Sequence, residues 1–162
     1  MNVVCNTSPL LVLAKIQRLG LLTQLYARLV IPGAVLEEIG AKADDAAAQI
    51  QALVATPPVT VQRATPQTLA ALPVDLGAGE REAIALAIET AADLVVLDDQ
   101  EGRRLARAHG LQVTGTVGVL VEARARGLLP ALRPELDRLR AAGLWLAEAF
   151  YQRLCQAEET SP

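Results

Sequence analysis

The sequence has few residues of several kinds, and each scarcity excludes a class of protein. Only 2% of the 162 residues are aromatic although 52% are hydrophobic, so the core must be built from Leu, Val, Ile and Ala. The two cysteines, Cys5 and Cys155, lie near opposite ends of the chain without CxxC spacing, which predicts thiols in a reducing compartment and no disulfide. The single histidine, His109, precedes a glycine at a predicted helix end, and without a Cys/His cluster a zinc site is not expected.

Long apolar runs are also missing. No run approaches the roughly 20 residues that a bilayer-spanning helix needs, and no cationic stretch precedes an apolar segment at the N-terminus. We therefore expect a cytoplasmic protein that does not contact the membrane. The formal net charge of -3 argues against a protein that coats duplex DNA with a broad basic surface. It is compatible with a concentrated acidic pocket near a few arginines.

Short apolar runs alternate with segments of helical periodicity along most of the chain. The predicted strands are residues 1–5, 29–31, 59–61, 94–97 and 111–113. The predicted helices are residues 10–25, 32–54, 80–90, 101–109, 117–126, 132–142 and 146–156, with interruptions at Gly20 and Gly40. Prolines flank residues 59–61, which predicts a strand at the edge of the sheet.

Strands that alternate with helices predict parallel pairing and right-handed crossovers. The expected fold is therefore an α/β, Rossmann-like three-layer α/β/α sandwich with a central parallel sheet. No repeat, low-complexity tract or long linker divides the chain. We expect one domain over residues 1–162, with a core of about 1–130 and C-terminal helices at about 131–158.

Polar and acidic residues follow two of the predicted strands. Asn6 comes after the first strand, and Asp98 and Asp99 come after the strand at 94–97. In an open parallel sheet, ligands bind outside the carboxyl ends of the strands, and Glu38 and Glu80 could reach the same edge. Oxygen ligands from several elements are what Mg²⁺ or Mn²⁺ requires. Carboxylates that converge without a cation would raise one another's pKa values, so the pattern indicates a metal site suited to phosphodiester hydrolysis.

Each of these acids also has an ordinary structural explanation. Glu80 can favour the start of a helix through the helix dipole, and Glu38 can be a solvated helix residue. The Asp98-Asp99 pair can form a turn or cap the next helix. The residues by themselves leave both interpretations open.

Four segments add a resemblance to a known family. They are VVCNTSPLLVLAKI, VIPGAVLEEI, GAGEREAIALAIETAADLVVLDDQEGRRLA and VTGTVGVLVEARARGLLP. In that order they resemble segments of PIN domains, and particularly of small prokaryotic PIN-like proteins related to the toxins of toxin-antitoxin pairs. The resemblance covers the chain to about residue 130, and the later helices resemble that subfamily's C-terminal extension.

The resemblance implies a Mg²⁺- or Mn²⁺-dependent endoribonuclease that cuts single-stranded RNA and is the toxin of a toxin-antitoxin pair. The family's first acid falls on Asn6, which is a departure from the pattern. Its second acid falls on Glu38 and its third on Glu80, with Glu82 as the alternative if the helix register differs. Its fourth falls on Asp98 or Asp99, which the motif does not separate.

The resemblance places Thr7 and Ser8 beside this pocket, and the predicted helix after Asp99 adds arginines that could bind the substrate. Thr7 and Ser8 would lie next to the metal, where Ser8 could bind a phosphate or a water, although both could instead cap the first helix. Arg103 and Arg107 share a helix face and could contact phosphates, or they could belong to a solvated surface. Arg103 is the preferred candidate because it lies nearest the acidic pair.

The apolar residues of the last two helices have more than one possible role. They can cover the core, form a homodimer or bind a cognate antitoxin protein. These residues are Leu136, Leu139, Leu144, Trp145, Leu146, Phe150 and Leu154.

Asn6 motivates the main alternative function. An amide oxygen can ligate a cation but adds no charge, so metal affinity should fall. The alternative is a catalytically weak or inactive PIN-like protein that binds RNA or a protein partner. A nucleotide-binding or phosphotransfer domain ranks last, because residues 115–118 are too poor in glycine for a phosphate loop and Glu38 and Glu80 would have no role.

Overall fold

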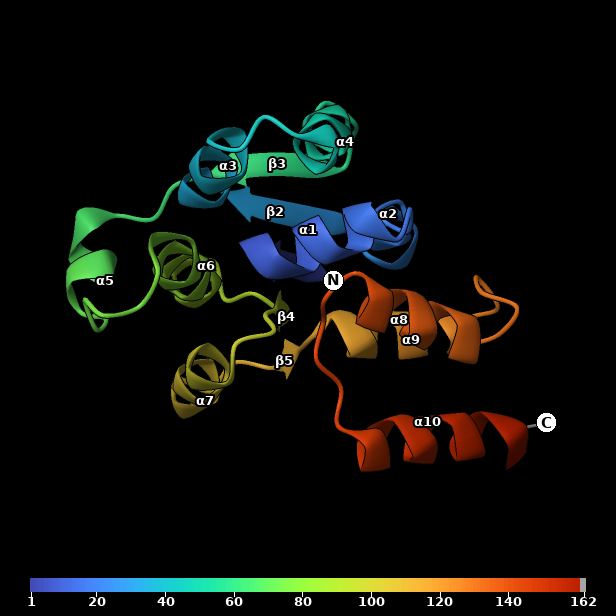
Figure 1. Cartoon of the computed structure of the whole chain (residues 1–162). Helices are drawn as coiled ribbons and strands as arrows, with labels where there is room; N and C mark the ends of the chain where they lie inside the picture. Colours follow the sequence, from blue (N-terminus) through green and yellow to red (C-terminus); the bar gives the residue numbers. More distant parts are fainter. Residues whose placement is uncertain (161–162) are drawn as a thin grey trace.

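Five short parallel strands form the central sheet, in the order β3-β2-β1-β4-β5 (Figure 1). They are β1 (Asn2–Cys5), β2 (Arg28–Pro32), β3 (Val59–Gln62), β4 (Leu94–Val96) and β5 (Val113–Thr114). The central strand β1 pairs in parallel with both β2 and β4. The computed structural model describes residues 1–160, so the last two residues of the predicted domain lie outside the described part. The predicted α/β fold with a parallel sheet is confirmed, and β3 lies at an edge as its prolines indicated.

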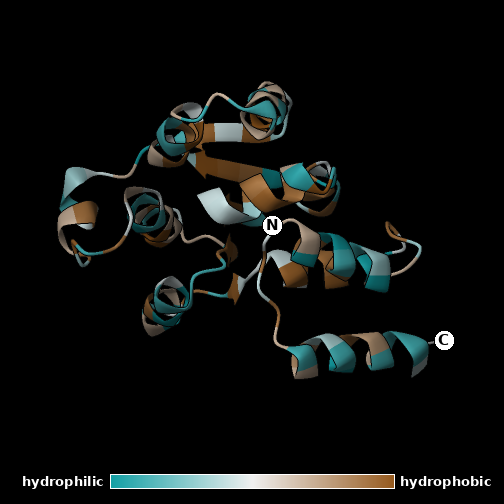
Figure 2. Ribbon diagram, viewed as in Figure 1, coloured by the Kyte–Doolittle hydropathy of each residue, from teal (hydrophilic) through white to brown (hydrophobic). Residues whose placement is uncertain are grey.

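Successive side chains of each inner strand pack into opposite faces of the sheet. Val3 and Cys5 of β1 belong to one buried cluster, whereas Val4 between them belongs to another. All three are fully buried. Because both faces are covered, β1, β2 and β4 contain continuous apolar runs without polar alternation, which explains why they could be recognised in the sequence. Figure 2 shows these apolar strands between helices of mixed hydropathy.

Helices on the two faces complete the three layers. One face is covered by α1 (Thr7–Lys15), α2 (Leu21–Leu25), α4 (Asp45–Val54) and α8 (Thr116–Ala125). The other face is covered by α6 (Ala78–Glu89) and α7 (Gln100–Ala108). The remaining elements in this part of the chain are α3 (Gly33–Gly40) and α5 (Pro66–Ala70). This is the predicted α/β/α arrangement.

Two predicted helices are each divided in the structure. The helix expected at 10–25 becomes α1 and α2, and the chain between them passes through Gln17 at φ 60°. The helix expected at 32–54 becomes α3 and α4, separated by Ala43 at φ 45°, and Asp44 caps α4 by accepting from Ala47 N at 2.9 Å. The interruptions predicted at Gly20 and Gly40 are confirmed, since Gly20 is the N-cap of α2 and Gly40 is the last residue of α3. The left-handed residues nearby are not glycines, so the sequence does not mark them.

The bounds predicted for the last strand were wrong. Leu111 was expected to begin it, but the Leu111 amide donates to Ala106 O at 3.0 Å and so belongs to the turn that closes α7. Gly110 allows this turn with φ +79°. The strand therefore begins at Val113.

Two C-terminal helices, α9 (Arg133–Ala141) and α10 (Glu148–Thr160), pack beside α8 (Figure 1). Leu136 and Leu139 of α9 are fully buried in the cluster that contains α1 and α8. Tyr151 of α10 is buried, and its hydroxyl donates to Asp137 Oδ1 at 2.7 Å. These residues therefore cover the core, whereas Trp145 between the two helices is 81% exposed. Within residues 1–160, no helix has both the length and the apolar character to cross a membrane.

Candidate functional site

The candidate site lies where the strand order reverses. From β1 the chain builds β2 and β3 on one side, and β4 and β5 later extend the sheet on the other side. The segments that leave β1 and β4 therefore diverge and open a crevice at their carboxyl ends. Asn6 directly follows β1, and its backbone N–H donates to Val96 O of β4 at 3.0 Å. This bond holds Asn6 close to the start of the Asp98-Asp99 segment.

An acidic cavity of about 550 Å³ occupies this crevice. The structure brings most of the predicted site residues to its lining, together with Lys15, which the prediction did not include. The predicted residues in the lining are Asn6, Thr7, Ser8, Glu38, Glu80, Asp98 and Asp99. Arg103 lies outside it, in a neighbouring hollow that also contains Asp98.

Glu38 reaches the cavity from α3 and is held there by two donors. Thr7 Oγ1 donates to its Oε2 at 2.6 Å, and Gly79 N donates to its Oε1 at 2.7 Å. A Cβ at Gly79 would lie only 2.6 Å from Glu38 Oε2, so the glycine makes room for the carboxylate at the start of α6. These two bonds orient the Glu38 carboxylate at the cavity, although the residue is exposed to solvent.

Asp98 is held by donors on both of its oxygens. Thr116 N donates to Oδ1 at 2.7 Å, and Thr116 Oγ1 donates to Oδ2 at 2.6 Å. Ser8 Oγ adds a longer contact of 3.4 Å to Oδ2. Thr116 is fully buried and was not among the predicted site residues, although the Gly115-Thr116 pair after β5 was a signal for a residue at a strand end. Such donors orient a carboxylate, as the outer shell of a metal site does.

Asp99 has a structural role as well as a place in the cavity. Its Oδ2 accepts from Gly102 N at 2.9 Å and caps α7. Capping of the next helix was the structural explanation given above for the Asp98-Asp99 pair. The capping interpretation of Thr7 and Ser8 was wrong. The N-cap of α1 is Asn6, which makes no side-chain cap bond, and both hydroxyls donate to carboxylates of the cavity.

Two buried oxygens at the cavity have no hydrogen-bond partner. They are Asn6 Oδ1 and Glu80 Oε1, and Asn6 is only 6% exposed. A buried acceptor without a partner costs about 1–3 kcal/mol. A cation bound in the cavity would be a partner for Asn6 Oδ1, whereas Glu80 Oε1 lies against α7, where a Cβ at Gly102 would be only 2.5 Å from it.

Glu80 titrates abnormally in this cavity. Burial is the main cause of its raised pKa, and the hydrogen bond and the charge of Asp99 are the next largest. The charge of Glu38 raises the pKa by a smaller amount, whereas a backbone hydrogen bond from Gly77 lowers it. Together they raise the pKa of Glu80 to about 7. Converging carboxylates were expected to have this effect on one another.

Glu82, the alternative to Glu80, is not in the cavity lining. It is 4% exposed, and it accepts from Ala34 N at 2.6 Å and from Ala64 N at 3.0 Å. These bonds join the start of α3 and the chain after β3 to α6. The geometry therefore favours Glu80 as the site residue and gives Glu82 a structural role.

Comparison with known families adds one finding. A family model described as a PIN domain matches residues 2–159. The chain belongs to the PIN-domain family. PIN domains are generally nucleases and typically use divalent metal ions. No curated protein matches the chain.

The side chains of this PIN domain offer the right donors for a hard cation but have not converged on one point. Within residues 1–160, no three His, Cys, Asp or Glu side chains lie close enough to form a metal-binding group as they stand. The acidic cavity nevertheless contains four carboxylates and the unpartnered Asn6 Oδ1. Oxygen donors of this kind fit Mg²⁺ or Mn²⁺, and the charge of such an ion would offset the repulsion between Glu80 and Asp99.

Replacing Glu82 with Ala should destabilise the PIN domain by about 2–4 kcal/mol, because two backbone N–H groups lose their acceptor. The expected fall in Tm is roughly 5–15 °C for a chain of this size. Glu89 on the same helix is a matched control, since it accepts from Thr65 N and Thr65 Oγ1 at the exposed surface. Thermal unfolding of both alanine variants measures this. Equal losses would contradict a special role for Glu82.

Replacing Glu80 with Gln should stabilise the metal-free protein at alkaline pH. The folded-state pKa of about 7 lies above the ordinary value of 4.5 for a glutamate, so the stability that the protonated group contributes is present at acid pH and is lost as pH rises through 7. Gln has no carboxyl group to ionise, so the variant does not lose this stability at alkaline pH. Allowing for the partial exposure of Glu80, we expect a gain of about 1 kcal/mol, or about 2–4 °C in Tm, at about pH 8.5 in EDTA.

The gain should disappear at about pH 3, which lies below both pKa values, so that Glu80 is protonated in the folded and in the unfolded state. Thermal unfolding in EDTA across this range measures it. If the variant is no more stable than the wild type at alkaline pH, the buried charge assigned to Glu80 is absent.

Proposed function

We propose that this PIN domain is a Mg²⁺- or Mn²⁺-dependent endoribonuclease that hydrolyses phosphodiesters of single-stranded RNA. The observation that carries the proposal is the buried, unpartnered Asn6 Oδ1 in a cavity of carboxylates at the reversal of the strand order. A buried acceptor among negative charges has a physical explanation if a cation binds there.

In this proposal the ion is held by Glu38, Glu80 and Asp98, with Asn6 as a neutral fourth ligand. When bound, it supplies the Lewis acidity that makes water nucleophilic and offsets charge on the scissile phosphate. Thr7 orients Glu38, and Thr116 and Ser8 orient Asp98. Asp99 caps the start of α7 and lies beside Glu80. The negative charge of Asp99 would stabilise a cation bound in the cavity.

Finer parts of the proposal concern the organisation and partners of the protein. We infer one domain over residues 1–162, because Leu136 and Leu139 of the C-terminal helices share the cluster of α1 and α8. The role of toxin in a toxin-antitoxin pair is proposed from the resemblance of its segments, and a homodimer or an antitoxin partner is proposed from the apolar residues of the last helices. A catalytically weak or inactive RNA- or protein-binding PIN domain is the second candidate, and the neutral Asn6 supports it.

Calorimetric titration with Mn²⁺ separates these two candidates. We expect one saturable site in the low millimolar range or tighter, lost in Glu38→Gln. Glu37→Gln is the matched control, because Glu37 is the exposed neighbour on the same helix and pairs with Arg63. If no saturable heat appears with either Mn²⁺ or Mg²⁺, the nuclease proposal fails and the binding function takes its place.

A further inference from the structure

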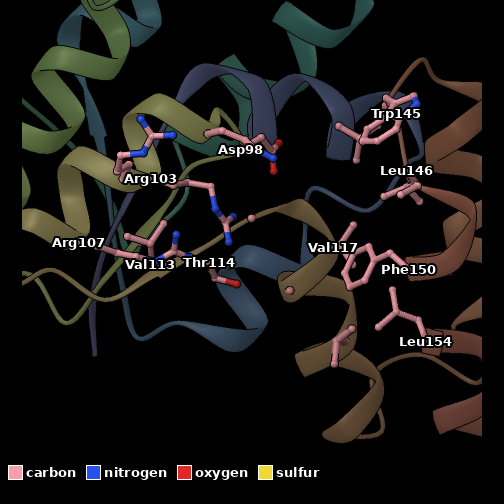
Figure 3. Close-up of a pocket in the computed structure, with 17 residues that line it drawn as sticks. Asp98, Arg103, Arg107, Val113, Thr114, Val117, Trp145, Leu146, Phe150 and Leu154 are labelled. Carbon is pink, nitrogen blue, oxygen red and sulfur yellow. The ribbon is translucent and has the colours of Figure 1, made fainter.

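A larger groove adjoins the acidic cavity (Figure 3). Its volume is about 900 Å³, and Asp98 and Leu144 line both the groove and the cavity. The two spaces therefore meet at Asp98, one of the proposed ligands. Whatever lies along this groove lies next to the site of the proposed chemistry.

One wall of the groove is basic and comes from α7. Arg103, Arg104 and Arg107 all line it. Arg104 pairs with Glu101 at 3.0 Å, whereas no ion pair within 4.0 Å involves Arg103 or Arg107 anywhere in residues 1–160. Burial and the charge of Arg107 lower the pKa of Arg103, and the negative charge of Asp98 nearby partly offsets these effects. Arg103 Nη1 donates to Leu97 O at 3.1 Å. A polyanion would supply the missing charge.

The opposite wall is apolar and aromatic. Trp145 precedes α10 and Phe150 lies within it, and both side chains project from this wall with Leu146 and Leu154 nearby (Figure 3). Trp145 is 81% exposed and Phe150 is 37% exposed. The other two aromatic side chains of the chain, Tyr26 and Tyr151, are buried. Both exposed rings of an aromatic-poor protein therefore gather on one groove.

A third hollow, of about 510 Å³, shares Glu80 and Asp99 with the acidic cavity. Its lining has four carboxylates, including Asp75 and Glu101, and one arginine, Arg104, whereas the charged residues of the groove are three arginines and Asp98. A nucleic acid strand would therefore be attracted to the groove more strongly than to this hollow.

We propose that this groove binds the stretch of a single-stranded RNA that flanks the scissile bond, with Arg103 and Arg107 at phosphates and Trp145 and Phe150 stacked on bases. The inference rests on the proposed function, because the groove leads into the acidic cavity. The strand is single, since a base offers its face to an aromatic side chain only when it is unstacked from its neighbours. The basic wall gives affinity without sequence preference.

The experiment is a binding titration of the full chain with a short oligouridylate in EDTA, so that cleavage does not enter the result. Trp145 is the only tryptophan, and its fluorescence reports directly on the groove. We expect saturable quenching in the wild type. Binding followed on a labelled oligouridylate should weaken about tenfold in Trp145→Ala and severalfold in Arg107→Ala, and a duplex of matched length should compete poorly.

Matched controls come from exposed residues that do not line the groove. Val74 is 84% exposed and Arg28 lies exposed at the amino end of β2, so Val74→Ala and Arg28→Ala should bind as the wild type does. The proposal is overturned if no quenching occurs, if the groove variants bind as tightly as the controls, or if sedimentation shows a dimer that Trp145→Ala dissociates. An acidic helical peptide that quenches Trp145 while the oligouridylate does not would likewise overturn it, in favour of a protein partner.

The two proposals can fail separately. Binding in EDTA that depends on Trp145 and Arg107 supports the groove even if the protein cuts no RNA with Mn²⁺. Cleavage with Mn²⁺ that is unaffected by these substitutions overturns the groove and leaves the nuclease in place.

Discussion

Replacing Asp98 with Asn should lower the rate of Mn²⁺-dependent RNA cleavage by at least about 100-fold. Asp98 lies where the acidic cavity meets the groove, and both of its oxygens are oriented by Thr116. Asn has the same shape but no charge, so the fold should survive while the cation loses a ligand. Cleavage of a labelled single-stranded RNA measures the rate, and circular dichroism checks the fold.

Asp99→Asn is the matched control for this substitution. Asn caps a helix about as well as Asp, so α7 should begin normally and the rate should fall less than about tenfold. The comparison also decides between the two neighbouring acids that the sequence did not separate. A large loss in Asp99→Asn with little loss in Asp98→Asn would contradict the assignment of Asp98 as the ligand.

Replacing Asn6 with Asp should tighten Mn²⁺ binding by about tenfold or more, because the charge of the ligand set governs the affinity for a hard cation. The new carboxylate would take the place of an oxygen that has no partner in the structure. Without metal, the same substitution adds a buried negative charge beside Glu80 and Asp98, so the protein should become less stable in EDTA.

Calorimetry with Mn²⁺ and thermal unfolding in EDTA measure the two effects. Asn2→Asp is a suitable control, since Asn2 lies at the opposite end of the same strand. If Asn6→Asp binds Mn²⁺ no more tightly than the wild type, Asn6 Oδ1 does not face the ion and the proposed ligand set is wrong.

The sheet could be predicted because its strands are buried on both faces. Val3, Val4 and Cys5 all lie in the core, so β1 is a continuous apolar run that a short window detects. Helix ends were harder to place, because Gln17 and Ala43 adopt left-handed backbone conformations without being glycine. The start of β5 depends on a hydrogen bond from Leu111 to Ala106, which closes a helix and leaves no mark on periodicity.

The lining of the cavity was predictable to the extent that it follows strand ends. Asn6, Asp98 and Asp99 could be placed there once a parallel sheet was inferred. Glu80 and Glu82 could not be separated, because residues two apart point to different sides of a helix and only packing decides which side faces the cavity. The hydrogen bond from Thr116 to Asp98 joins residues 18 apart in the sequence, and it forms only because β5 pairs with β4.

The groove could not be predicted from the sequence either, because it depends on how distant segments pack together. Arg107 and Trp145 belong to separate segments, and their approach across one space depends on the path of the chain between α9 and α10. Periodicity placed the last apolar residues on helices, but it did not distinguish buried Leu136 from exposed Trp145.

The most direct test of the central claim is incubation of the wild-type protein with an end-labelled single-stranded RNA in Mn²⁺ and in EDTA, beside Asp98→Asn in Mn²⁺. We expect internal cleavage by the wild type with Mn²⁺, no cleavage in EDTA and almost none by the variant. Cleavage that persists in EDTA or in Asp98→Asn, or a wild type that cuts no single-stranded RNA with Mn²⁺ or Mg²⁺, would contradict a metal-dependent nuclease centred on the acidic cavity.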